Sequence, residues 1–428
     1  MVTKPNLYLL PTAYKAGKVY SVLPADGVGD FDFSRATTAT RINKDGLIET
    51  VGSNIPRLNY PMIDGVVSGC PSLLLEPQRT NLFTHSEDFS NTSWNKGNLT
   101  VIANQAISPD GSQNADEITP DATTGTIRIW QTKTTSTTTY SLSFFVKYNG
   151  KQYVQLLFGS LFNSVDFSNF DLINGTVTLG TGEIESYGNG WYKISLTASL
   201  NAATDQVYLW SIDSATSSRG ASSTGNGSDG LYIWGAQLEE QSYATSYIPT
   251  NGSTVTRDAE TCTGAGDVNT FNDSEGVLFA EISALVEYDT IFKGISLNDG
   301  SVANLVLIYT TSALNSIRVV VQSNSVNQFD KTYVVPSLKD FNKVALKYKA
   351  NDFSFWVNGI EIDSQLSGST PIGLNSLDFD EGTGTEKYFG STKQIQYFPT
   401  ALNDSDLETF TSWTSFSDMA TAQLYSII

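Results

Sequence analysis

Residues 353–363 read Phe-Ser-Phe-Trp-Val-Asn-Gly-Ile-Glu-Ile-Asp. The central Asn358-Gly359 pair is the strongest two-residue signal for a hairpin turn, because both turn positions need positive φ. Aromatic and β-branched residues on either side of the pair favour strands. The stretch therefore predicts two antiparallel strands joined by a tight turn.

The composition extends this prediction to the rest of the chain. Of 428 residues, 11% are aromatic and only 16% are charged, and Gly, Ser, Thr and Asn separate short β-branched and aromatic runs. This profile is typical of all-β proteins. The chain is too long for one ordinary core, so we expect two or three domains.

The distribution of strand-like runs divides the chain into four segments. They are an N-terminal segment with hairpins (1–84), a first antiparallel β-sandwich or jelly roll (85–250), a Gly-, Thr- and Asp-rich linker (251–274) and a second β-sandwich (275–428). Alternating runs separated by turn residues indicate packed antiparallel sheets. The predicted strands of the two sandwiches include 140–146, 153–158, 175–179, 191–200, 205–212, 230–235, 305–309, 316–321, 342–348 and 352–357.

Two local motifs sharpen this description. Residues 39–42 and 47–50 are predicted to pair as a hairpin around the turn residues 43–46. Near the C-terminus, a strand is followed by Pro399 and then by a short helix that Asn403 is expected to cap.

Three sets of residues carry a resemblance to known families. Residues 32–49, 56–60 and 73–82 resemble the leader of bacteriophage head- and tail-fibre proteins that display lectin-like domains. Residues 187–193, 231–240 and 244–250 are similar to carbohydrate-binding-module-like jelly rolls. The hairpin at 353–363 and the strand, proline and capped helix near the end resemble a concanavalin A-like or laminin-G-like lectin domain.

The resemblance implies a phage virion protein, a head or tail fibre or spike. Its N-terminal segment is expected to attach to capsid or tail proteins, and its sandwiches to bind cell-surface, mucosal or environmental glycans. Fibres of this kind are usually homo-oligomers, and trimers are the common expectation, although no heptad segment shows one here. The N-terminus lacks the pattern of a signal peptide, so we expect synthesis in a host cytoplasm and a final location on the virion surface.

The charge distribution separates the segments. The net charge of -19 is divided into +1 for residues 1–84, -8 for 85–250 and -12 for 251–428. Nucleic acid and anionic membranes would be repelled, so neither is an expected partner. The nearly neutral first segment suits an anchor that buries itself against a partner. Within it, we expect the arginines to contribute to virion attachment: Arg35, Arg41, Arg57 and Arg79.

Catalytic residues do not form a recognisable set. Glu361-Ile362-Asp363 begins like the strand motif of some glycoside hydrolases, but Leu366 stands where the second catalytic carboxylate would be. His85, the only histidine, has no nucleophile motif beside it. We therefore expect a protein that is not an enzyme. A polysaccharide-degrading depolymerase, hydrolase or lyase, with a site between sandwiches or subunits, is one alternative, and a decoration protein without a ligand is another.

No cofactor or metal is expected. Cys70 and Cys262 are far apart and show no metal-site spacing, so both are expected to be free thiols. The carboxylates of Asp378, Asp380 and Glu381 are close in sequence and suit Ca²⁺ chemically, so calcium is an alternative, but their spacing does not match a calcium loop of the helix-loop-helix type. A solvated acidic loop is the favoured interpretation.

Aromatic residues are the best candidates for glycan binding, because sugars stack their C–H faces on aromatic rings. Trp130, Tyr208 and Trp210 are predicted to lie on a sheet face or at its rim. By contrast, the remaining strand tryptophans are expected to pack in the cores: Trp191, Trp234 and Trp356.

Overall fold

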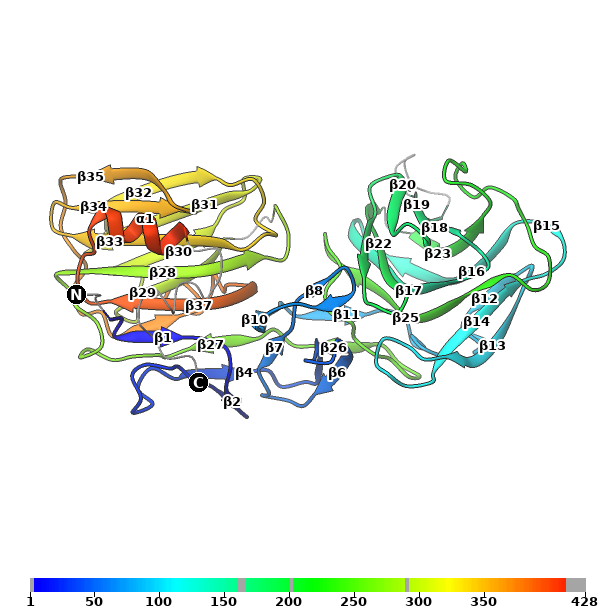
Figure 1. Ribbon diagram of the computed structural model, residues 1–428, viewed down its shortest axis with the longest axis horizontal. Coiled ribbons are helices and arrows are strands. Elements are labelled where there is room, and N and C mark those ends of the chain that lie inside the picture. Colours follow the sequence, from blue (N-terminus) through cyan, green and yellow to red (C-terminus); the bar gives the residue numbers. More distant parts are fainter. Residues whose placement is uncertain (1–3, 160–166, 201–202, 289–291, 413–428) are drawn as a thin grey trace.

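The computed structural model describes residues 4–159, 167–200, 203–288 and 292–412. Two β-sandwiches lie side by side and are joined by a narrow neck (Figure 1). Every pair of strands within the sheets is antiparallel, and one short helix lies near the end of the described chain. The all-β prediction with two sandwiches is confirmed.

Two sheets form the first sandwich. One runs in the order β12 (Asn95–Gly97), β16 (Ile127–Thr135), β23 (Ala203–Ile212), β18 (Tyr153–Phe158), β19 (Phe167–Asp171), β20 (Thr176–Leu179). The other runs β13 (Leu99–Ala106), β14 (Ala115–Pro120), β25 (Gly230–Glu240), β17 (Thr138–Asn149), β22 (Trp191–Leu200), β21 (Glu183–Ser186). A small pair, β15 (Thr124–Gly125) and β24 (Ser223–Thr224), lies beside them.

Strand alternation fills the core between these sheets. Ile127 and Ile129 of β16, and Val207 and Leu209 of β23, point inward and are fully or almost fully buried. The residues between them point to the outer face, because successive side chains on a strand alternate.

The second sandwich incorporates strands from both ends of the chain. Its larger sheet runs β35 (Ile360–Gln365), β34 (Phe353–Val357), β33 (Asn342–Lys349), β28 (Glu275–Ala284), β37 (Gly390–Phe398), β10 (Ser72–Leu75), β7 (Arg57–Asn59), with β1 (Leu7–Leu9) also on β37. The facing sheet runs β32 (Val326–Val334), β31 (Ser316–Ser323), β30 (Leu305–Thr310), β29 (Lys293–Asn298), β36 (Ser376–Asp378). Leu7, Leu73 and Leu75 are part of its core.

The prediction that residues 1–84 form a separate N-terminal segment is therefore corrected. This segment does form hairpins, namely β2 (Tyr14–Lys15) with β3 (Lys18–Val19), β5 (Ala39–Ile42) with β6 (Ile48–Val51), and β8 (Met62–Ile63) with β9 (Val66–Val67). However, β1, β7 and β10 complete a sheet of the second sandwich. Their apolar side chains are buried there, so the segment and the second sandwich share one core.

The first sandwich is consequently an insertion. The chain enters it through β11 (Arg79–Asn81) and leaves it through β26 (Val255–Arg257), and these two strands pair with each other. The predicted linker at 251–274 is structured, since it also contains β27 (Thr261–Thr263), which pairs with β4 (Phe31–Ser34). Insertion between two paired strands keeps the entry and exit points together.

The local sequence motifs are confirmed. Asn358 and Gly359 have φ of 50° and 86°, and they join β34 to β35. The helix α1 (Asp404–Ser412) begins after Asn403, whose Oδ1 accepts a hydrogen bond of 2.9 Å from the main-chain N–H of Asp406. Leu407 and Phe410 of α1 pack with Trp356 on the outer side of the larger sheet.

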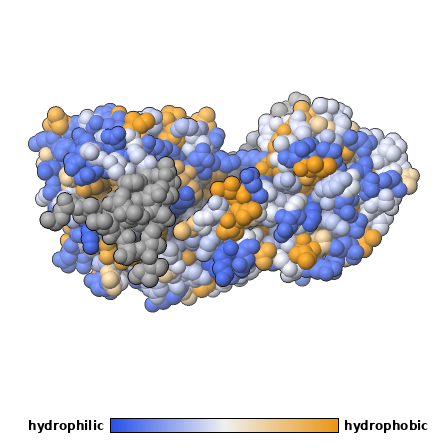
Figure 2. All heavy atoms as spheres, viewed as in Figure 1, coloured by the Kyte–Doolittle hydropathy of each residue, from blue (hydrophilic) through white to orange (hydrophobic). Residues whose placement is uncertain are grey.

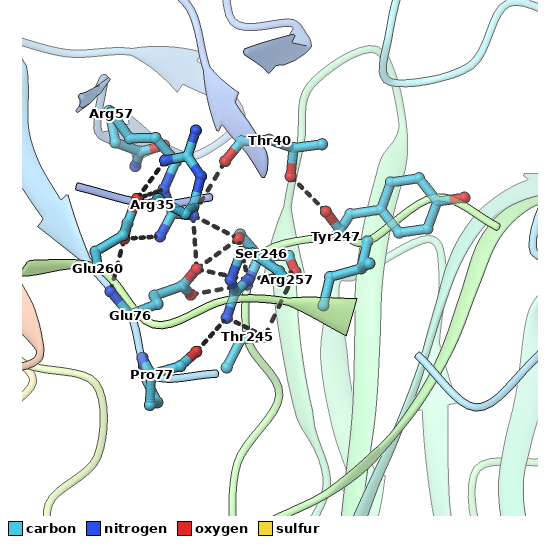
Figure 3. A network of polar contacts seen from close by, with 12 residues as sticks. Arg35, Thr40, Arg57, Glu76, Pro77, Thr245, Ser246, Tyr247, Arg257 and Glu260 are labelled. Atoms are coloured by element: carbon cyan, nitrogen blue, oxygen red, sulfur yellow. Dashed lines mark hydrogen bonds and ion pairs between the residues drawn. The ribbon is translucent and has the colours of Figure 1, made fainter. Parts of the chain in front are cut away.

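Five charged side chains form a buried network of ion pairs at the neck (Figure 3). We call it the neck network, and its members are Arg35, Arg57, Glu76, Arg257 and Glu260. Arg57 contacts both carboxylates, with 2.6 Å from its Nη1 to Oε2 of Glu76 and 2.8 Å from its Nε to Oε1 of Glu260. Arg35 lies 2.6 Å from Glu260, and Arg257 lies 2.8 Å from Glu76. The side chains of all five are almost completely buried.

The network also fixes the main chain around it. Ser246, which lies between β25 and β26, donates its N–H to Oε1 of Glu76 at 2.9 Å. Arg35 donates to the carbonyl oxygens of Thr37, Gly52 and Ile55. Charged groups are buried here only because each has several partners, which offset the cost of leaving water.

We predict that Arg57→Ala lowers the free energy of unfolding by about 3–5 kcal/mol, because it leaves two buried carboxylates without their shared cation. Urea unfolding of the whole chain measures this loss. The matched control is Lys18→Ala, which removes an exposed pair with Asp32, and we expect it to cost less than about 1 kcal/mol. Equal effects of the two changes would contradict a structural role for the network.

A second prediction concerns pH. Burial by itself would raise the pKa of Glu76, but Arg257 and Arg57 outweigh it and hold that pKa well below its usual range. The resulting stabilisation is therefore present above the unfolded-state value of about 4.3 and is lost as the pH falls below it. Glu76→Gln should be less stable than the wild type at neutral pH, and its stability should fall less between about pH 5 and about pH 3. Parallel pH curves for the two proteins would refute this assignment.

Candidate functional site

The three aromatic residues predicted to bind glycans lie together on the outer face of the first sandwich. Trp130 of β16 is directly opposite Tyr208 of β23. The ring centroids are 5.8 Å apart for Trp130 and Tyr208, and 5.4 Å apart for Tyr208 and Trp210. Both strands direct these residues outward because the intervening residues fill the core.

An arginine that the sequence prediction missed lies at the centre of this group. Arg128, two residues before Trp130 and opposite Trp210, places its guanidinium carbon 4.8 Å from the ring centroids of both tryptophans and 5.4 Å from that of Tyr208. We call these four residues the aromatic-arginine cluster. The i, i+2 spacing of Arg128 and Trp130 on one strand was the signal that could have identified it.

The guanidinium of Arg128 has no polar partner among the residues that the structure describes. In the described part of the chain, the side chain of Arg128 makes no hydrogen bond or ion pair, and its Nε is buried without an acceptor. Gly97 of β12 lies beside it, where a Cβ would be 3.5 Å from the Arg128 side chain and 3.4 Å from Trp130. The cation is therefore positioned by packing and cation–π contacts alone.

The four residues differ in exposure. Tyr208 and Trp210 are buried, with 6% and 4% of their surface exposed, whereas Trp130 and Arg128 are half-buried. Trp210 is covered by the loop at 213–222 and donates its Nε1–H to the carbonyl oxygen of Ala221 at 2.9 Å. A ligand would therefore meet mainly Trp130 and Arg128, with the other two rings behind them.

The covering loop is anchored by buried amides. Asn169 donates to the carbonyl oxygens of Ala215 and Ser217, and Gln155 donates to that of Ser218. Gln155 also donates to Oδ1 of Asn169 at 2.7 Å, and both side chains are fully buried. These bonds hold the loop against the sheet beside the cluster.

The opposite outer face of the first sandwich is covered by the β5–β6 hairpin and by the chain around Tyr247, and we call this contact region the junction. Trp191, Trp234 and Phe145 pack there against Ile48 of the β5–β6 hairpin and against Tyr247. Trp191 and Trp234 are buried as predicted, but in this junction cluster and not in the core between the sheets. The face that carries the aromatic-arginine cluster thus points away from the junction.

Apolar surface is also exposed near the junction. Figure 2 shows a hydrophobic patch near the middle of the molecule, over the β8–β9 hairpin, where Ile63 and Val66 are more than half exposed. The tip of this hairpin touches the first sandwich at Gly188, where a Cβ would lie 2.4 Å from the carbonyl oxygen of Gly65. Only glycine at 188 allows this close approach.

The predicted attachment arginines have internal roles in this structure. Arg35 and Arg57 belong to the neck network, and Arg79, which is 7% exposed, lies with its guanidinium carbon 5.0 Å from the ring centroid of Tyr243. Arg41 is half-buried and lies 3.5 Å from Glu49 on the neighbouring strand. Their part in virion attachment stays a prediction, and for Arg35 and Arg57 the side chains do not reach the surface.

The acidic loop differs from its prediction as a solvated segment. Asp378, Asp380 and Glu381 are buried, with exposed fractions of 4–7%. Asp378 accepts hydrogen bonds from the main-chain N–H of Gly264 and the side chain of Asn298, and Asp380 accepts one from the N–H of Gly382. Donors of the chain thus occupy these oxygens, and in the described residues no three His, Cys, Asp or Glu side chains form a group suited to a metal ion.

The remaining candidates lie apart from the cluster. Glu361 and Asp363 are on the edge strand β35, where Asp363 pairs with Lys331 at 3.1 Å, and Leu366 is exposed. His85 is half-buried beside the neck, and its carbonyl oxygen accepts a hydrogen bond from Trp94. Cys70 is exposed and Cys262 is buried, and both are free.

A cleft of about 950 Å³ lies between the two sandwiches. It is lined by strands β21 and β22 on one side and by residues 283–287 on the other, and the ion pair of Glu183 with Lys339 at 2.6 Å links its walls. Glu183, Ser195 and Thr197 make its surface polar. Its lining contains few exposed aromatic surfaces for stacking, in contrast to the cluster on the outer face.

Comparisons with known proteins found likenesses in structure but not in sequence. No family model matches the chain, and no curated protein matches it. The carbohydrate-binding module CBM40 of a Ruminococcus gnavus IT-sialidase, also solved with α2,3-sialyllactose, is similar at 16% identity over 34% of this chain and 91% of that chain, with a TM-score of 0.28.

Two other solved structures are similar. A leech intramolecular trans-sialidase matches at 18% identity over 34% of this chain and 24% of that chain, with a TM-score of 0.27. Domains LG4-5 of the mouse laminin α1 chain match at 9% identity over 80% of this chain and 95% of that chain, with a TM-score of 0.23. The fold assignment given above depends on the strand order and register of the chain itself.

Proposed function

We propose that this protein binds glycans through the aromatic-arginine cluster on the outer face of the first sandwich. The observation that carries the proposal is the convergence of Trp130, Tyr208 and Trp210 with Arg128 on a face that points away from the junction. Aromatic rings bind the C–H faces of sugars, and a few placed polar groups select among them.

Polar groups continue along the same face. Thr132 of β16 is opposite Gln206 of β23, one step along the strands from the pair of Trp130 and Tyr208. Thr132 is exposed and Gln206 is half-buried. A hydroxyl and an amide next to a tryptophan suit a sugar, which presents an apolar ring face and hydroxyl edges to the same surface.

The wider role that we propose is adhesion by a phage virion protein, a head or tail fibre or spike that displays this face as part of a homo-oligomer. The resemblance of residues 32–49, 56–60 and 73–82 to fibre leaders supports it. The same residues also build the neck, because Arg35, Arg57 and Glu76 come from them. In this proposal the segment that resembles a fibre leader also holds the two sandwiches together.

We predict that Trp130→Ala weakens glycan binding about tenfold or more, because it removes the half-exposed ring on which a sugar would stack; tenfold corresponds to about 1.4 kcal/mol. A glycan array identifies a bound sugar, and calorimetry then compares the variants. The matched control is Tyr148→Ala, an exposed tyrosine on the other sheet of the same sandwich, which should bind as the wild type does.

Two results would overturn the glycan proposal. One is an array without any bound glycan for correctly folded protein, which would favour a decoration protein instead. The other is a glycan whose binding is unaffected by Trp130→Ala. New reducing ends after incubation with host polysaccharide would favour the depolymerase alternative.

The virion role has its own prediction. Mass spectrometry of purified particles should detect this chain, and labelling should find the first sandwich accessible to antibody on intact particles. We expect the first sandwich to be accessible because of its charge, since an acidic sandwich suits solvent better than a buried interface. Absence of the chain from particles would contradict the virion role while leaving glycan binding untouched.

A further inference from the structure

We propose that Arg128 makes the aromatic-arginine cluster selective for sugars that carry a carboxylate directly on the ring, such as uronic or nonulosonic acids. The inference rests on the proposed glycan binding and adds the class of sugar to it. Its basis is a cation that the fold positions on an aromatic surface and that has no anionic partner among the described residues.

The lack of an anion is unusual for this chain. Asp and Glu outnumber Lys and Arg by 44 to 25. Five other arginines contact carboxylates inside the protein: Arg35, Arg41, Arg57, Arg257 and Arg318. Arg128 has neither a carboxylate nor a carbonyl partner among the described residues, although its side chain is half-buried. A half-buried guanidinium gains more from an incoming carboxylate than a fully hydrated one does, because part of its hydration is already lost.

The geometry suits a carboxylate. Trp130 and Trp210 each lie 4.8 Å from the guanidinium carbon, and this packing restricts the orientation of the Arg128 side chain. The planar fork of N–H donors matches the two oxygens of a carboxylate, and a side chain that is already ordered loses less entropy on binding.

The short distance between Trp130 and Arg128, together with the charge of the sandwich, limits the size and the charge of the ligand. The guanidinium carbon is 4.8 Å from the Trp130 ring centroid, so a monosaccharide that contacts the exposed part of this ring lies within its own length of Arg128. The first sandwich has a net charge of -8 over residues 85–250, which opposes polyphosphates and densely sulfated chains at long range. A single carboxylate on an otherwise neutral ring avoids most of this repulsion.

The experiment compares sugars that differ only at the carboxylate. Methyl glucuronide is paired with methyl glucoside, and methyl galacturonide with methyl galactoside; N-acetylneuraminic acid is paired with its methyl ester. Binding of each to the whole chain is measured by ligand-observed NMR for wild type, Arg128→Gln, Arg128→Lys and Trp130→Ala. Thermal unfolding of each variant establishes that it is folded.

We expect the wild type to bind at least one acidic sugar about tenfold more tightly than its neutral partner, which equals about 1.4 kcal/mol. Arg128→Gln should remove the preference and retain weak binding of both members of the pair. Arg128→Lys should keep part of the preference, because the charge remains without the bidentate fork. Higher salt should reduce the preference but not the binding that depends on Trp130.

The outcomes separate the two proposals. Equal binding of acidic and neutral sugars, lost in Trp130→Ala, overturns the carboxylate preference and leaves glycan binding intact. A preference that survives in Arg128→Gln also overturns the assignment to Arg128. If no sugar of either class binds, or if neither Trp130→Ala nor Arg128→Gln changes binding, the glycan proposal fails as well.

Discussion

The buried contact of Arg57 with Glu76 and Glu260 is the interaction on which the arrangement of this protein depends. Arg57 lies on β7, Glu76 lies between β10 and the strand that enters the first sandwich, and Glu260 follows the strand that leaves it. Removing these charges from water is costly unless every one is paired, so the three segments are held in one arrangement. The network is therefore best understood as a device that specifies the arrangement of the chain at the neck.

This arrangement determines which surfaces are free to bind. The junction covers one outer face of the first sandwich with the β5–β6 hairpin, and it leaves the face with Trp130 and Arg128 uncovered. A rigid neck would keep that face directed away from the second sandwich (Figure 1). The N-terminal segment would therefore contribute indirectly to the proposed glycan binding, by holding this face outward.

Local sequence predicted the elements and part of the site. The turn at Asn358-Gly359 and the helix cap at Asn403 were predictable because each depends on residues that are neighbours in the chain. Trp130, Tyr208 and Trp210 were selected by chemistry alone, and the structure brings them together. Arg128 was missed because its i, i+2 spacing places it on the same strand face as Trp130 but does not reveal that Trp210 lies opposite it.

By itself, the sequence determined an all-β chain and two sandwiches, since these follow from short-range periodicity and turn chemistry. Only the tertiary structure decided that β1 and β10 complete the second sandwich, that the first sandwich is an insertion, and that Arg35 and Arg57 are internal. Pairing between Leu7 and Tyr397 spans almost the whole chain. No local pattern encodes such a contact, because it depends on which sheet edge remains open once the other strands have paired.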